Sequence, residues 1–134
     1  MLWGREIVSE LENLRRDLLI QRPPIHWVGD TGEPAWGPNF QGFGGGYDNC
    51  HFWKTKEGVV HLSGWAKRTI VGAETLIYTL PVGFRPEKAH VYIVSCFPNY
   101  GWITVNANGT VISFAGTGPN FWIGTEATFI STRI

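Results

Sequence analysis

The chain has 134 residues with 11 basic and 11 acidic side chains, so its formal net charge is zero and nothing marks it as a nucleic-acid binder. The length excludes a separate cofactor domain, no apolar run reaches the ~20 residues of a membrane span, and the first residues lack the pattern of a secretory signal. Aromatic residues (14%) and 17 glycines against only 16% charged residues predict a compact, mainly β protein made in the cytoplasm.

The first predicted element is a helix over about residues 5–21. Ile7, Leu11, Leu14 and Leu18 are spaced by four, three and four residues, which is the seam of a parallel coiled coil. The flanking charges also fit a heptad, and a pair of prolines ends the helix. We therefore predict that these four residues hold parallel copies of the chain together. The alternative is an ordinary amphipathic helix that packs on its own domain.

Residues 23–48 are predicted to be a linker rich in Gly, Pro and aromatic residues. Its rings, among them Phe43 and Tyr47, are expected to fix an extended segment on a sheet. The glycine run 42–46 is not a phosphate-binding loop, because no strand precedes it and no Lys-Ser/Thr closes it.

Residues 49–134 contain seven or eight short predicted strands, which indicate a sandwich or a barrel. Of the two, we predict an antiparallel, jelly-roll-like β-sandwich. Two hairpins are the clearest features. One turns near Gly58, between 52–54 and 59–65, and the other turns at Asn108-Gly109, between 102–105 and 110–114. The remaining strands are expected at 75–80, 90–96, 121–123 and 127–131.

Catalytic and metal-binding patterns are missing from the sequence. The four histidines form no His-x-His or HExxH motif, so neither a metal nor a cofactor is predicted. No pair of acids has a catalytic context, and Cys50 and His51, as strand neighbours, would point to opposite faces. We therefore expect no enzyme activity. Cys50 and Cys96 either form one disulfide or stay as two buried thiols.

The best candidates for ligand contact are aromatic residues in two loops. Tyr100 and Trp102 follow one turn, and Asn120 and Trp122 follow another. Tyr and Trp rings stack on sugars and anchor interfaces, so these four residues are the predicted binding site, although each ring also suits a core.

The segment Leu80-Pro-Val-Gly-Phe-Arg-Pro86 resembles the "LPxGFRP" motif in head domains of bacteriophage tail-fibre and receptor-binding proteins. Three more segments resemble that family in the same order: 56–64, 90–96 and 108–111. The resemblance implies a homotrimeric, non-enzymatic virion protein whose β-sandwich head follows a coiled coil.

Together these features predict a phage virion protein with a coiled-coil helix (1–22), a linker (23–48) and a head (49–134). Its expected partners are itself, other virion proteins and a host cell-surface polysaccharide, with no nucleic acid and no membrane insertion. Two alternatives stay open: a capsid decoration or head-fibre protein that covers the shell, and a polysaccharide depolymerase.

Overall fold

The structure is a computed structural model that describes residues 4–20, 23–69, 75–96, 99–114 and 122–131. It is mainly β with one N-terminal helix, as predicted, and its described strands form three antiparallel sheets. The elements are, in chain order, α1 (Gly4–Ile20), β1 (His26–Trp27), β2 (Phe40–Gly42), β3 (His51–Lys54), β4 (Val59–Ser63), β5 (Trp65–Arg68), β6 (Thr75–Thr79), β7 (His90–Cys96), β8 (Asn99–Val105), β9 (Thr110–Ser113), β10 (Trp122–Gly124) and β11 (Ala127–Ile130).

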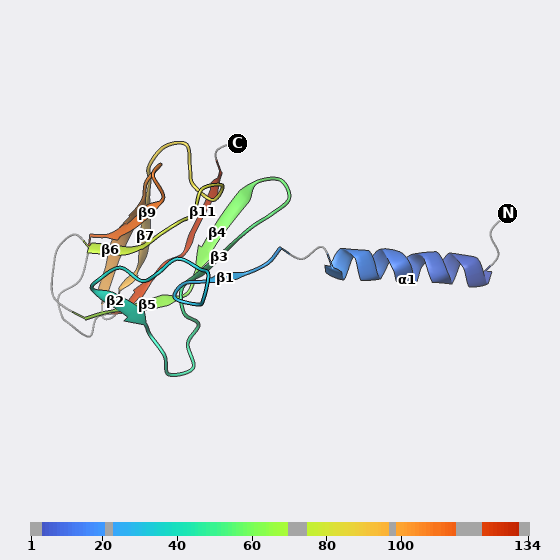
Figure 1. Cartoon of the computed structure of the whole chain (residues 1–134), viewed down its shortest axis with the longest axis horizontal. Coiled ribbons are helices and arrows are strands. Elements are labelled where there is room, and N and C mark those ends of the chain that lie inside the picture. Colours follow the sequence, from blue (N-terminus) through green and yellow to red (C-terminus); the bar gives the residue numbers. More distant parts are fainter. Residues whose placement is uncertain (1–3, 21–22, 70–74, 97–98, 115–121, 132–134) are drawn as a thin grey trace.

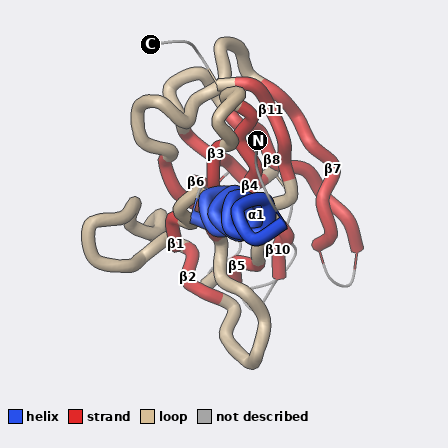
Figure 2. Tube along the Cα trace, turned by 90° about the vertical axis from the view of Figure 1, so that its right-hand side faces the viewer, coloured by secondary structure: helices blue, strands red, loops and turns tan. Residues whose placement is uncertain are grey.

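Helix α1 projects away from the β body, as Figure 1 and the end-on view of Figure 2 show. All described side chains from Gly4 to Arg16 are exposed, and Ile7, Leu11 and Leu14 are 46–59% exposed. The stripe therefore does not pack on its own β body, and the alternative of an ordinary self-packed helix is wrong for these residues. The backbone of Leu18 is helical, but its side chain lies outside the described residues.

Two four-stranded sheets enclose most of the core. The first has the order β1-β3-β4-β11 and the second the order β6-β9-β8-β7. The buried residues come from both sheets: Phe52 of β3 stacks on Tyr78 of β6 with ring centroids 6.0 Å apart. The Tyr92 hydroxyl of β7 donates a hydrogen bond to the Thr128 carbonyl of β11. The arrangement is thus sandwich-like.

A third, smaller sheet has the order β10-β5-β2 and continues the first one. Strands β4 and β5 are separated only by Gly64, and β10 and β11 only by Thr125 and Glu126. Because β4 pairs with β11 and β5 pairs with β10, these four strands form one two-stranded ribbon that bends at Gly64 and passes into the small sheet.

The two predicted hairpins are present. Strands β3 and β4 turn at Gly58, and β8 and β9 turn at Gly109, both with positive φ. Part of the segment predicted to be a linker belongs to the body instead, because β1 pairs with β3 and β2 pairs with β5. No described helix has both the length and the apolar character that crossing a membrane requires.

Candidate functional site

The residues predicted to bind a ligand fall on two different sheets. Tyr100 and Trp102 lie on the outer face of β8, opposite Ser95 and Ile93 of β7, and are 75% and 45% exposed. Trp122 lies on β10, in the small sheet, opposite Lys67 of β5. Asn120 lies outside the described residues. The structure therefore brings Tyr100 and Trp102 together on β8, whereas Trp122 lies on the small sheet among different residues.

Trp122 belongs to a group of four aromatic rings, which we call the ring cluster: Phe43, Tyr47, Trp65 and Trp122. The ring of Phe43 meets Trp122 nearly edge to face, with centroids 4.2 Å apart, and meets Tyr47 at 4.9 Å. Tyr47 lies 6.0 Å from Trp122 and 6.4 Å from Trp65. These short distances join three segments that are far apart in the sequence.

The glycines before Tyr47 explain how its ring reaches the cluster. Gly44, Gly45 and Gly46 all have positive φ, a conformation that residues with a side chain rarely adopt. The Tyr47 amide donates a hydrogen bond to the Gly44 carbonyl, which closes the turn. A Cβ added at any of the three would meet nothing within 4 Å, so the loop stands in open space beside the rings.

The position of Trp65 depends on the bend of the ribbon. Its amide donates a hydrogen bond to the Asp48 carbonyl at 2.9 Å, which ties the end of the glycine loop to the start of β5. A Cβ added at Gly124 would lie 3.5 Å from the Trp65 ring, so the ring lies over a strand position that has no side chain. This is an ordinary van der Waals distance, so the Trp65 ring packs directly over the backbone of β10.

Polar side chains share the face of the ring cluster. Gln41, Lys67 and Trp122 are directly opposite one another in the register of the small sheet, so their side chains leave the same face. Gln41 is exposed and Lys67 is half-buried. Rings beside an amide and an ammonium group suit a ligand that has an apolar face and a polar edge.

The LPVGFRP segment lines a separate open groove of about 570 Å³. Gly83 has positive φ, and its carbonyl accepts a hydrogen bond from the Lys54 ammonium group at 2.8 Å. Phe84 is held under the turn by Phe52, whose ring centroid is 5.2 Å away. Across the groove, the imidazole of His26 pairs with the Glu33 carboxylate at 3.0 Å. The prediction that Phe84 tucks under the turn is confirmed.

Both cysteines are buried free thiols, so the disulfide alternative is wrong. Burial raises the pKa of Cys50 to about 12 and that of Cys96 to about 11. Both thiols are therefore protonated at neutral pH, which is unfavourable for a nucleophile. Among the described residues, no group of three or more His, Cys, Asp or Glu side chains could hold a metal ion.

No protein-family model and no curated protein sequence matches the chain. Among solved structures, the chain is similar to the crystal structure of the receptor binding protein (gp15) of Listeria phage PSA. The TM-score is 0.65 at 11% sequence identity, and the match covers 99% of this chain and 82% of that chain. At this identity the likeness concerns the fold. Because it covers almost the whole chain, it includes α1 as well as the β body.

Sequence reasoning assigned Phe43 and Tyr47 a structural role and did not single out Trp65. The sequence did contain one indication, because Phe43 and Tyr47 flank a run of three glycines that have no side chains for these rings to pack against. What the sequence did not show is that β5 and β10 are neighbours, which is what brings Trp65 and Trp122 together.

Proposed function

We propose that this protein is a bacteriophage virion protein of the receptor-binding type, which forms a homotrimer and attaches to a glycan on the host surface. The observation that carries the proposal is the likeness of the whole chain, helix and β body together, to a phage receptor binding protein. The LPVGFRP segment supports the same assignment independently, since it resembles a motif of such heads.

The exposed stripe of α1 supports the trimer. Three apolar side chains, those of Ile7, Leu11 and Leu14, are roughly half exposed in the single chain and follow a heptad. Such a stripe is normally buried, and parallel copies of the same helix would bury it. A 17-residue helix is marginal in water by itself, so association of the helices also explains why it forms.

The non-enzymatic role is part of the same proposal. The buried thiols are protonated at neutral pH, and aromatic surfaces with nearby polar groups favour binding. Attachment needs many weak contacts to a repeated surface polymer, and three linked heads increase their combined strength without any new contact.

The experiment measures adsorption of the purified intact chain to cells of the phage's host and to cell-wall polysaccharide extracted from them. We expect saturable binding to both and competition between them, with no release of reducing sugar ends. Release of reducing ends would favour the depolymerase instead. Failure to bind cells together with tight binding to assembled capsids would overturn the receptor-binding role and favour a decoration protein.

A further inference from the structure

We propose that the ring cluster is a saccharide-binding site that takes a pyranose ring. This inference rests on the proposed function and gives the glycan a location and a chemical class. It also places the site on the small sheet, away from Tyr100 and Trp102.

The first argument is that the four rings are not part of the core. The buried core comprises Phe52, Tyr78, Phe129 and their neighbours, and the half-buried side chains that pack against it are Trp36, Phe84 and Tyr92. None of the four cluster rings is in either group. Four large rings gathered outside the core are unusual, because a soluble protein gains most from aromatic residues by burying them.

The second argument is access. Tyr47 is 52% exposed, and the three glycines that precede it leave open space beside the cluster. Side chains at those positions would fill part of this space. The positive φ angles there favour glycine, so the space stays open. The exposed Tyr47 ring and the open space beside the three glycines therefore give a ligand a side from which to approach the cluster.

The third argument is chemical. One face of a pyranose carries C–H groups that stack on aromatic rings, and its edge carries hydroxyls that need hydrogen-bond partners. The near-perpendicular rings of Phe43 and Trp122 form an aromatic corner, and Lys67 lies opposite Trp122 in the register. The described residues offer the Lys67 ammonium group no salt-bridge partner within 4 Å. It is therefore available to a sugar hydroxyl, with the Gln41 amide beside it.

The outer face of β7 and β8 lacks this combination. Its exposed large side chains are Val91, Ile93, Tyr100 and Trp102, and no outward position described between Val91 and Thr104 carries a charge or an amide. Its outward polar groups are the hydroxyls of Ser95, Tyr100 and Thr104, and it lacks the ammonium and amide groups that lie beside the ring cluster. The structure therefore favours Trp122 over Trp102 as the residue that contacts the glycan.

The test is saturation-transfer NMR with the intact protein and the methyl pyranosides of glucose, galactose, rhamnose and N-acetylglucosamine as probes. We expect transfer to the C–H protons of at least one of them. Trp122→Ala should reduce this transfer by about tenfold or more, a usual size for the loss of one aromatic anchor. Lys67→Met should weaken it less, because it removes one donor and keeps the rings.

Two matched controls remove a Trp from another sheet. Trp102→Ala removes an exposed ring of β8, and Trp53→Ala removes a half-buried ring of β3. Both should keep the transfer, and circular dichroism checks that each variant is folded. To cover a Trp122→Ala variant that does not fold, Tyr47→Ala changes an exposed ring and should also lose the transfer.

The inference is overturned if no pyranoside shows transfer, or if Trp102→Ala abolishes it while Trp122→Ala and Tyr47→Ala do not. In either case, adsorption of the intact protein to host cells would leave the receptor-binding role standing. Absence of that adsorption would instead count against the role itself.

Discussion

The main-chain amide of Thr125 donates a hydrogen bond to the carbonyl of Gly64 at 2.9 Å, and the Thr125 hydroxyl lies 3.1 Å from the same oxygen. The hydroxyl is also within reach of the Ser63 carbonyl and the Cys50 sulfur. Thr125 is fully buried, so it joins the two strands of the bent ribbon at the one place where both leave the large sheet. The position of the small sheet, and of the ring cluster on it, depends on this contact.

Gly64→Ala should destabilise the protein strongly. Gly64 has a φ of +98°, and an added Cβ would lie 2.1 Å from the Asn49 carbonyl oxygen, which is backbone and cannot move alone. We expect the free energy of unfolding to fall by about 3 kcal/mol or more, measured by urea denaturation. Gly32→Ala is the control, because its φ is +80° with nothing within 4 Å. It should cost only about 1 kcal/mol, and equal losses would contradict a steric cause.

The buried thiols predict a loss of stability in alkaline solution. Burial raises the pKa of the Cys50 thiol from its ordinary value of 9.0 to about 12 in the folded protein, so the unfolded chain releases this proton first. The protonated Cys50 thiol contributes fully to the free energy of unfolding below pH 9. This contribution is lost as the pH rises toward 12, by up to about 1.4 kcal/mol per pH unit. Urea denaturation at several pH values should show that Cys50→Ala flattens this decline. A parallel decline in both proteins would rule out the thiol as its source.

Tyr78→Phe should stabilise the protein slightly. The Tyr78 hydroxyl is fully buried, and no hydrogen-bond partner is found for it among the described residues. Burial of such a group costs about 1–3 kcal/mol, and Phe keeps the ring that stacks on Phe52. Thermal denaturation should give a higher midpoint for the variant. A lower midpoint would mean that the hydroxyl has a partner, such as an ordered water.

Leu14→Asp should prevent trimer formation without unfolding the β body. Leu14 occupies a seam position of the heptad and is 59% exposed in the single chain, so the change harms only a contact between copies. Asn13→Asp adds the same charge one residue earlier, on the outer side of the heptad, and should leave the assembly intact. Mass in solution distinguishes the two. A monomeric intact chain, with the same state for a chain that begins at Pro24, would refute the coiled coil.

Local features of the fold could be predicted from the sequence with good accuracy. Helix α1 and strand β7 were predicted within one residue, because each has a clear period and a clear stop. The β8–β9 hairpin followed from Asn108-Gly109, whose glycine has the positive φ that the turn needs.

The division into sheets could not be predicted, and the reason is visible at Gly64. The run from Val59 to Trp65 was predicted as one strand, because it is rich in apolar and β-branched residues and follows the turn at Gly58 without a proline. The structure ends that strand at Ser63, since Gly64 turns the chain and Trp65 begins a strand of another sheet. A change of sheet requires only one glycine with positive φ, and the sequence does not show which glycines adopt it.

The members of the ring cluster could not be predicted for the same reason, because the sequence does not show which strands are neighbours. Trp122 was correctly placed on a strand near the end of the chain, but its neighbours were unknown. Phe43 and Tyr47 reach it only because β2 and β10 both pair with β5. Contacts of this kind depend on strand order, which hydrophobic periodicity does not specify.

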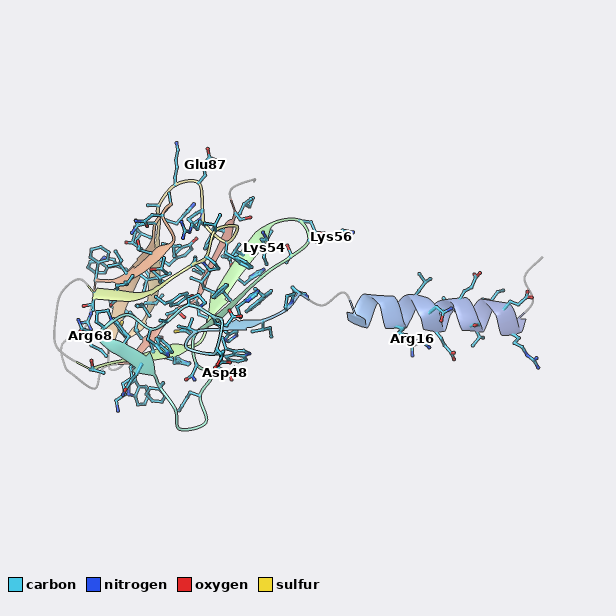
Figure 3. The ribbon with its side chains drawn as sticks, viewed as in Figure 1. Arg16, Asp48, Lys54, Lys56, Arg68 and Glu87 are labelled. Carbon is cyan, nitrogen blue, oxygen red and sulfur yellow. The ribbon has the colours of Figure 1, made fainter. Side chains whose placement is uncertain are left out.

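The separation of α1 from the β body has a consequence for evolution. Between them the chain passes through Pro23 and Pro24, and no described side chain of α1 from Gly4 to Arg16 is buried (Figure 3). If the proposed function holds, a genetic crossover at these two codons would exchange the β body for another one and leave the helical stem unchanged. Chimeras joined at this point should therefore fold, and under the proposed function they would redirect a particle to a new bacterium.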